Sequence, residues 1–329
     1  MTILITGASG FLGGRLTKYL AQNSNYKVLA TSRSNHRAEE LQAKGARYVA
    51  GNPMQKDFIF PLLKEADAVV HCAALSSPWG KKEDFHQANF ILTKQLIDWC
   101  KKADVKRFVN ISTPSLYFNF QDRFDVSESE PLPTKLVNAY AETKLAAEQY
   151  ALAQNSAQIK VVSLRPRAII GAEDTVLFPR LMRAYEEGKL RIIGDGKNIA
   201  DFTSVGNLVV AIDLALHASD NACGRTYNIT DGQPLPMWET VNTLLKRLGK
   251  KPLTKRVPYP IVAAYARFSE WKSRMTDGKE PALVHYGVAS LAKSVTLDIS
   301  AAREYLGYEP VISTMETLEE FVLWYEGKR

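Results

Sequence analysis

Three features of this 329-residue sequence predict an α/β fold built on a doubly wound parallel sheet. The apolar run at residues 3–5 leads directly into a glycine-rich turn and then an amphipathic stretch. Strand-like and helix-like segments alternate through the first half, and this alternation loosens after about residue 165. The strand-like runs are continuously apolar, which is typical of strands buried on both faces of a parallel sheet, and they lie at 27–31, 47–50, 68–72, 107–111 and 160–164.

The glycine-rich turn predicts a site for the pyrophosphate of a dinucleotide. Glycine permits backbone angles that other residues avoid, and it lets the chain approach an anion closely. The helix that follows offers free N–H groups and the positive end of its dipole. The spacing differs from the commoner Gly-x-Gly-x2-Gly, so a turn that only starts a helix is the alternative. The residues expected to contact the cofactor here are Gly7, Ser9, Gly10, Phe11, Leu12 and Gly13.

We divide the chain where the alternation of strand-like and helix-like segments loosens, at about residue 165. Residues 1–165 are expected to form an NAD(P)-binding Rossmann domain, completed by residues 203–222. Residues 166–202 and 223–329 are expected to form a smaller α/β substrate-binding region. Because the sequence has neither an internal repeat nor a low-complexity linker, this region should pack tightly against the first.

The composition favours a cytoplasmic enzyme without a nucleic-acid partner or a metal site. The formal charge of +7 partly reflects a basic cluster at 246–256, which we interpret as a solvated helix end and loop because no recognition motif accompanies it. Three scattered cysteines lack metal-ligand spacing and suit a reducing compartment. A strand that begins at residue 2 leaves no room for a signal peptide, and no apolar run reaches membrane-spanning length.

Tyr140 and Lys144 are the strongest candidates for catalytic chemistry. They lie four residues apart in a strongly helical segment, so their side chains share one face. A lysine ammonium stabilises a nearby phenolate, so we expect a lowered tyrosine pKa and a general acid or base for an alcohol or carbonyl oxygen. Tyr185 and Lys189 have the same spacing, but their segment has the pattern of a solvated helix end.

A hydroxyl-bearing strand end completes this candidate site. The apolar run at 107–111 ends in Ser112 and Thr113, and its carboxyl end should face the ligand crevice of the sheet. A hydroxyl at this position would hold a substrate oxygen beside Tyr140. The glycine turn, this strand end and the Tyr140-x3-Lys144 helix together resemble the extended short-chain dehydrogenase/reductase family in order and spacing, over essentially the whole chain.

The resemblance implies roles for two polar residues. It implies that Thr113 is the catalytic hydroxyl, with Ser112 as the alternative. It also implies that Asn89 helps to position Lys144 and supports a proton relay through water. Leu92 stands where the corresponding family motif has a glycine, which weakens the match around Asn89.

The resemblance and one physical argument predict the rest of the cofactor site. Ala73 and Ala74 would lie beside the adenine ribose, and Pro166 would lie over the nicotinamide. An acidic residue after the second strand would bind the ribose 2′-hydroxyl of NAD, whereas an arginine accommodates the 2′-phosphate of NADP. Arg33 stands there, so NADP(H) is the expected cofactor, and NAD(H) is the alternative if Arg33 only stacks on adenine. Asn52 replaces an aspartate that the family often has near the adenine amine.

Two substitutions argue against a nucleotide-sugar substrate. The sugar-nucleotide branch holds the diphosphate with an asparagine and an arginine, and Ala168 and Ala200 stand at those positions here. Leaving a diphosphate unpaired in a closed site would be costly. Segments 76–80, 165–167 and 190–196 instead resemble the 3β-hydroxysteroid dehydrogenase branch, and within it bacterial 2-alkyl-3-oxoalkanoate reductases. We therefore expect an apolar ketone or secondary alcohol as substrate. A nucleotide-sugar epimerase or dehydratase and a non-catalytic NADP-sensing protein are the alternatives.

Five apolar side chains are candidate walls of the substrate pocket, each with an ordinary core role as its alternative: Leu75, Trp79, Tyr117, Phe118 and Phe178. Arg167 has two interpretations. It could meet the carboxylate of a 3-oxo acid, but a structural ion pair is the interpretation favoured by sequence alone.

The segment 259–275 and the oligomeric state give two further expectations. The segment is expected to cover the substrate pocket as a lid, and a membrane surface is the alternative because basic residues flank its apolar face. That face is formed by Ile261, Val262, Tyr265, Phe268 and Trp271. The family resemblance implies a homodimer that pairs through the helices containing Tyr140 and Trp99.

Overall fold

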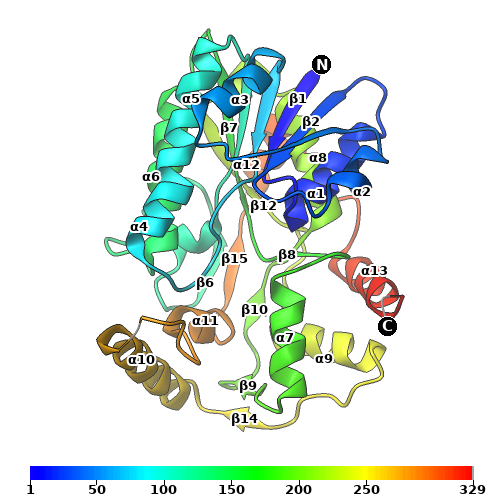
Figure 1. Cartoon of the computed structure of the whole chain (residues 1–329). Coiled ribbons are helices and arrows are strands. Elements are labelled where there is room, and N and C mark those ends of the chain that lie inside the picture. Colours follow the sequence, from blue (N-terminus) through cyan, green and yellow to red (C-terminus); the bar gives the residue numbers. More distant parts are fainter. Residues whose placement is uncertain (277, 328–329) are drawn as a thin grey trace.

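The computed structural model describes residues 1–276 and 278–327 and confirms the predicted α/β class (Figure 1). Its central sheet has seven parallel strands in the spatial order β12-β7-β5-β4-β1-β2-β3. The chain changes direction across the sheet between β1 and β4, which places a ligand crevice at the carboxyl ends of the strands. The strands are β1 (Thr2–Thr6), β2 (Lys27–Ser32), β3 (Arg47–Ala50), β4 (Ala68–His71), β5 (Arg107–Ile111), β7 (Lys160–Pro166) and β12 (Arg225–Ile229).

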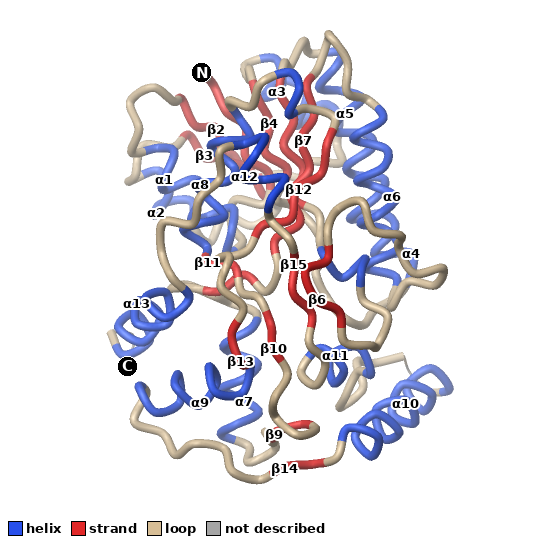
Figure 2. Tube along the Cα trace, turned by 180° about the vertical axis from the view of Figure 1, so that it is seen from behind, coloured by secondary structure: helices blue, strands red, loops and turns tan. Residues whose placement is uncertain are grey.

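Helices cover both faces of this sheet. Side chains of α1, α8 and α12 pack on one face, and those of α3, α5 and α6 pack on the other. Figure 2 shows α1 and α8 on one side of the strands and α5 and α6 on the opposite side. Their bounds are α1 (Phe11–Ala21), α2 (Ala38–Gln42), α3 (Lys56–Lys64), α5 (Leu92–Lys102), α6 (Ala139–Ala153), α8 (Val205–Leu216) and α12 (Ser300–Leu306).

The strands expected from apolar runs are present within two residues of their predicted ends. β4 ends one residue earlier than expected, and β7 continues two residues further. The edge strand β12 was not expected, so the assignment of residues 223–329 to the substrate region is wrong for this strand. Thr226 and Asn228 interrupt its apolar pattern, and it therefore lacks the signal that marked the other strands. The remainder of the proposed division stays a prediction.

A smaller group of short strands and helices lies beyond the carboxyl ends of the central sheet, in the lower half of Figure 1. Its four-stranded sheet has the order β13-β10-β15-β6, and two strand pairs, β8 with β11 and β9 with β14, accompany it. The strands are β6 (Arg123–Val126), β8 (Ile169–Ile170), β9 (Ile192–Ile193), β10 (Ile199–Ala200), β11 (Thr203–Ser204), β13 (Leu235–Pro236), β14 (Arg256–Val257) and β15 (Val295–Leu297). The helices are α4 (Lys82–Phe85), α7 (Leu177–Glu186), α9 (Met237–Arg247), α10 (Tyr259–Met275), α11 (His285–Ser290) and α13 (Thr314–Glu326).

The carboxylate of Asp231 ties α8 and α13 to the end of β12. It accepts hydrogen bonds from the Ser204 N–H and hydroxyl, the Asn207 amide and the Thr314 hydroxyl, all at 2.7 Å. Asn207 also bonds to both main-chain polar groups of Ile312. Hydrogen bonds to a charged group each contribute roughly 1.5–3 kcal/mol. This buried cluster therefore fixes β11, which lies next to the site.

The apolar face of α10 differs from the expected lid. Val262 packs inward, and the residues that turn toward the protein are otherwise small, such as Ala263 and Ala266. The large side chains are instead 53% to 63% exposed: Ile261, Tyr265, Phe268 and Trp271. The expectation that this face packs over a pocket is therefore wrong for four of its five members. Within the described ranges, no helix has the length and hydropathy to cross a membrane.

Candidate active site

The glycine turn depends on close backbone contacts that only glycine allows. Gly7 has a φ of 71°, and a Cβ on it would lie 2.7 Å from the Ala73 nitrogen. A Cβ on Gly13 would lie 2.8 Å from the Gly7 carbonyl carbon. Helix α1 begins at Phe11, and its N-cap Gly10 has no side chain with which to cap the first N–H groups. This cradle fits the pyrophosphate of a dinucleotide, as the sequence predicts.

The other predicted cofactor residues share this edge of the sheet. Ala73 and Ala74 follow β4, Asn52 follows β3, and Pro166 ends β7. The Asn52 side chain accepts a hydrogen bond from the Met54 nitrogen at 3.1 Å, so it shapes its own loop. All four residues therefore lie at the same edge of the sheet as the glycine turn.

Two arginines lie between β2 and the glycine turn. Arg33 is exposed at the end of β2, where a cofactor phosphate is expected. Arg37 was not singled out from the sequence, because it lies five residues beyond the strand. Its Nη1 donates to the Gly10 carbonyl at 3.4 Å, and its guanidinium pairs with Glu40 and Glu173. Both cations thus contribute positive charge beside the cradle.

Tyr140 meets two hydroxyl side chains at the start of α6. Its hydroxyl is influenced by those of Thr113, just beyond β5, and Ser76, which the sequence analysis missed. Burial raises the pKa of Tyr140 above 10.0, and these two neighbouring hydroxyls oppose the rise. Ser112 has a buried hydroxyl that lacks a hydrogen-bond partner within the described chain. The geometry therefore favours Thr113 over Ser112 as the hydroxyl beside Tyr140.

Lys144 lies one turn further along α6 and is almost wholly buried. Its ammonium donates to the carbonyl of Ile111 at the end of β5. Burial lowers the pKa of Lys144 from 10.5 to about 8, while Glu148 and Cys72 oppose that shift. The expectation that Lys144 lowers the pKa of Tyr140 is not met in this state. The pKa of the phenol is set by burial and hydroxyl contacts, because the ammonium turns toward the strand end.

Asn89 lies in a π-helical turn, His86–Ile91, and such turns occur frequently at functional sites. Its Oδ1 accepts from the Leu75 nitrogen at 2.8 Å, and its Nδ2 donates to the Leu75 carbonyl at 3.2 Å. The same Nδ2 donates to the Thr143 hydroxyl of α6 at 3.3 Å. Asn89 therefore fixes the segment that carries Ser76 and joins it to the helix that carries Tyr140 and Lys144.

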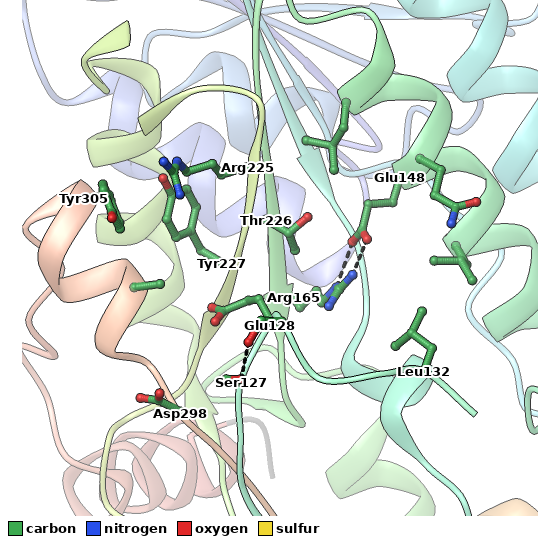
Figure 3. Close-up of a pocket in the computed structure, with 15 residues that line it drawn as sticks. Ser127, Glu128, Leu132, Glu148, Arg165, Arg225, Thr226, Tyr227, Asp298 and Tyr305 are labelled. Carbon is green, nitrogen blue, oxygen red and sulfur yellow. Dashed lines mark hydrogen bonds and ion pairs between the residues drawn. The ribbon is translucent and has the colours of Figure 1, made fainter. Parts of the chain in front are cut away.

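A buried ion pair lies one turn beyond Lys144. The Glu148 carboxylate accepts from Arg165 on β7 through Nε, at 2.9 Å, and through Nη2. Arg165 also donates to the Tyr117 hydroxyl, which donates to the Asn228 side chain at 2.9 Å. Figure 3 shows the ion pair at the wall of a cavity of about 680 Å³, lined mainly by α6, β12 and the 127–132 segment. This cavity is separate from the hydroxyl cluster around Tyr140.

Two of the expected pocket walls are wrong. Tyr117 is fully buried, and its hydroxyl is used by the polar network around Arg165. Phe178 packs against Phe321 of α13 with ring centroids 4.1 Å apart, inside the core between α7 and α13. Both are core residues, and a core role is the alternative that the sequence analysis gives for each of these apolar side chains.

Three other side chains, Leu75, Trp79 and Phe118, were also expected to line the pocket. Leu75 and Trp79 are half-buried on the loop after β4, and the Arg274 guanidinium of α10 lies over the Trp79 ring at 5.3 Å. Phe118 is buried, and its ring meets that of Tyr286 edge-on at a centroid distance of 5.2 Å. Their role as pocket walls stays a prediction.

Arg167 lies immediately beyond β7 and is 8% exposed. Its nitrogen donates to the Thr203 hydroxyl at 3.0 Å, and its carbonyl accepts from that hydroxyl at 2.6 Å. The favoured structural ion pair is wrong, because no carboxylate of the described chain pairs with its guanidinium and its Nε lacks a partner. Tyr286 of α11 is the neighbouring residue that sequence reasoning missed. Burial raises the pKa of Tyr286, and Arg167 and Ser115 oppose this rise.

Gly13→Ala should weaken NADPH binding by about tenfold or more, because a methyl group must displace the Gly7 backbone in the anion cradle. Gly206→Ala in α8 is the control at a glycine outside the cradle. Its new Cβ would meet only a methyl group of Ile312 at 3.7 Å, which is an ordinary contact. Titration of nicotinamide fluorescence measures both affinities. Equal affinities in the two variants would contradict the steric assignment.

Lys144→Met should stabilise the cofactor-free protein at neutral pH. The lysine pKa is about 8 when folded and 10.5 otherwise, so the buried charge costs about 3 kcal/mol below pH 8, and this cost disappears toward pH 10.5. Urea unfolding at pH 7 and pH 10 should show that the advantage of the variant shrinks as pH rises. Exposed Lys135→Met is the control, and a pH-independent difference would contradict the shift.

Three similarities connect this geometry to known proteins. Residues 3–230 match the model of the NAD dependent epimerase/dehydratase family. The chain is 34% identical over 325 residues to 2-alkyl-3-oxoalkanoate reductase from Stenotrophomonas maltophilia, with 97% of each chain covered. It is 27% identical to the human sterol-4-alpha-carboxylate 3-dehydrogenase, decarboxylating, over 97% of this chain and 86% of the relative.

A solved structure shows the same fold. The UDP-glucuronic acid 4-epimerase from Bacillus cereus in complex with NAD superposes with a TM-score of 0.78 at 26% identity, covering 99% of both chains. The names of the curated relatives confirm the expected class of enzyme, a nicotinamide-dependent dehydrogenase or reductase, and the expected branch. The glycine cradle, the Tyr140–Lys144 pair and these similarities agree: the chain belongs to the NAD-dependent epimerase/dehydratase family.

Proposed function

We propose that this protein is an NADP(H)-preferring oxidoreductase that interconverts a ketone and a secondary alcohol on an apolar 3-oxo/3-hydroxy acyl or steroid-like substrate. The observation that carries the proposal is the grouping of Tyr140 with the neighbouring Thr113 hydroxyl, one turn before buried Lys144 on α6. This group lies at the same edge of the sheet as the glycine cradle. A proton donor, a hydroxyl that orients the substrate oxygen and a cofactor cradle are what such a reaction requires.

Each residue of the site has a distinct task in this proposal. When bound, the nicotinamide supplies or accepts the hydride. In the reductive direction Tyr140 donates the proton to the substrate oxygen, and Thr113 orients that oxygen by a hydrogen bond. Lys144 holds the cofactor ribose and stabilises the phenolate that proton donation leaves behind. Asn89 acts as a positioning residue that fixes the Ser76 segment, and we keep its support of a water relay as a prediction.

The apolar substrate class is supported by the curated relatives and by this chain's own residues. The bacterial relative is named for 2-alkyl-3-oxoalkanoates, and the human one for a sterol carboxylate. Ala168 and Ala200 supply no polar side chain at the two positions where the sugar-nucleotide branch holds a diphosphate. The epimerase alternative therefore rests on family membership and overall fold.

Tyr140→Phe should reduce ketone turnover by roughly 100-fold or more, because it removes the proton donor and leaves the cofactor cradle intact. Tyr185→Phe is a matched control, since this tyrosine also precedes a lysine by four residues but donates to the Lys251 carbonyl at the surface. NADPH consumption with long-chain ketones measures both rates. Normal turnover in Tyr140→Phe, or epimerisation of a UDP-sugar without net cofactor consumption, would overturn the proposal.

The preference for NADP(H) rests on Arg33. It is exposed beyond β2, and no carboxylate intervenes between it and Arg37. An arginine at this position accommodates a 2′-phosphate, and the missing carboxylate removes the usual partner of the NAD ribose. Cytoplasmic location and a homodimer paired through α5 and α6 remain predictions.

Arg33→Glu should weaken NADPH binding by about tenfold or more and leave NADH binding less affected, because a carboxylate repels the 2′-phosphate and can bind a 2′-hydroxyl. Nicotinamide fluorescence titrations with both cofactors measure the ratio. Arg37→Ala is measured in parallel, since Arg37 also borders the cradle. An unchanged NADPH affinity in Arg33→Glu together with a loss in Arg37→Ala would move the phosphate contact to Arg37.

A further inference from the structure

The side chain of Arg167 is a buried cation without a partner. Only 8% of the residue is exposed, and Nε lacks a hydrogen-bond partner among the described residues. Its main chain is held on both sides by Thr203, so the residue cannot easily move to solvent. Burial lowers the pKa of Arg167, and nearby Tyr286 and Asp201 oppose this shift without forming an ion pair.

An unpaired buried guanidinium is energetically costly. The effective penalty of burying an ion is several kcal/mol unless an opposite charge and hydrogen bonds offset it. Arg165, two residues earlier, is also buried, but its guanidinium has Glu148 and Tyr117 as partners. The guanidinium of Arg167 lacks such partners among the described residues, which indicates that its partner arrives with a ligand. Because guanidinium donors match carboxylate and phosphate geometry, that partner is an oxyanion.

The unpaired cation lies in the polar group that surrounds Tyr140. Arg167, Tyr140 and Ser115 all influence the pKa of Tyr286, so these side chains are neighbours. The Ser115 hydroxyl lies 2.9 Å from the Thr113 hydroxyl, which in turn influences the pKa of Tyr140. Arg167 therefore belongs to the same group of polar side chains as Tyr140.

Two other sources of negative charge fit less well. The cofactor pyrophosphate belongs to the cradle after β1, and three strand spacings, roughly 14 Å, separate β1 from β7 in the sheet order. The Asp201 carboxylate is buried and accepts from the Leu297 nitrogen at 2.7 Å, so it holds β15. Neither supplies a direct partner for Arg167. The remaining anion is one that the substrate carries.

We propose that Arg167, with Tyr286 beside it, binds the carboxylate of the substrate and thereby selects a 3-oxo or 3-hydroxy acid over a neutral ketone or alcohol. This inference rests on the proposed function, and it names Arg167 as the residue that determines the substrate class. In a 3-oxo acid one carbon separates the carboxylate from the reacting carbonyl. The carboxylate therefore meets a cation close to Tyr140 while the alkyl chains extend away. The hydride and proton transfers remain those of the proposed function.

The test compares oxidation of a 2-alkyl-3-hydroxyalkanoate with that of its methyl ester, using NADP⁺ and the full-length protein. The hydroxy acid is chosen because 3-oxo acids lose carbon dioxide spontaneously. The variants are Arg167→Gln, Arg167→Lys and Tyr286→Phe, and exposed Arg180→Gln is the charge-matched control. The readout is the ratio of kcat/KM for acid and ester, together with KM for the acid and the melting temperature.

The wild type should prefer the acid, and Arg167→Gln should lower the acid-to-ester ratio by about 100-fold, mainly through KM. Arg167→Lys should recover part of the ratio because it restores the charge without the planar fork. Tyr286→Phe should give a smaller loss in the same direction. An unchanged ratio in Arg167→Gln, or an equal loss on both substrates together with a lower melting temperature, would overturn the inference in favour of a structural role.

Direct binding separates this inference from the proposed function. If the wild type oxidises neither compound, the proposed function fails. Calorimetric titration of the NADPH complex with the hydroxy acid then decides the inference alone. Binding that is lost in Arg167→Gln and retained in Arg180→Gln supports the carboxylate site. No binding, or binding that is equal in both variants, contradicts it.

Discussion

The buried ion pair between Arg165 and Glu148 is the constraint on which the geometry of the site depends. Two charges removed from water are tolerated only when they pair well and their remaining hydrogen-bonding groups are satisfied. Here the pair joins α6 to β7, and Tyr117 extends it to β12 through Asn228. Tyr140 and Lys144 precede Glu148 by two helical turns and one, on the same face. Fixing Glu148 therefore fixes the rotation of α6 and directs both side chains to the strand ends.

The end of β7 carries two buried arginines with different environments. Arg165 has a carboxylate and a phenol as partners within the fold. Among the described residues, Arg167 is held only through its main chain, by Thr203 and Ile229. A pair that served stability alone would cost less if apolar side chains of similar size replaced it. Arg165 therefore contributes rigidity and orientation, and Arg167 contributes a charge that folding leaves unsatisfied. The first supports the proton donor, and the second is available to a ligand.

The sequence predicted the parts of the structure that repeat a local rule. Continuous apolar runs marked six strands, and the glycine spacing marked the cradle, because both depend on neighbouring residues. Tyr286 and Ser76 had no such signal, since they reach Tyr140 only after distant segments pack together. Tyr117 and Phe178 were misplaced because an aromatic residue gives the same pattern in a pocket wall and in a core. Whether a charged side chain finds an ion-pair partner depends on the fold and cannot be read from its residue type. The ion pair expected for Arg167 was therefore wrong.

Burial shifts three titratable groups around this site, Tyr140, Lys144 and Arg167, toward their neutral forms. It raises the pKa of Tyr140 and lowers the pKa values of Lys144 and Arg167. The resting phenol is therefore protonated and ready to donate, whereas the two cations are held at a cost. In the proposed reaction, proton donation leaves a phenolate one helical turn before Lys144, and a bound carboxylate would lie beside Arg167. Under that proposal both cations gain a negative neighbour that the free protein does not supply. A site arranged in this way uses its desolvated charges to favour the occupied, reactive state over the empty one.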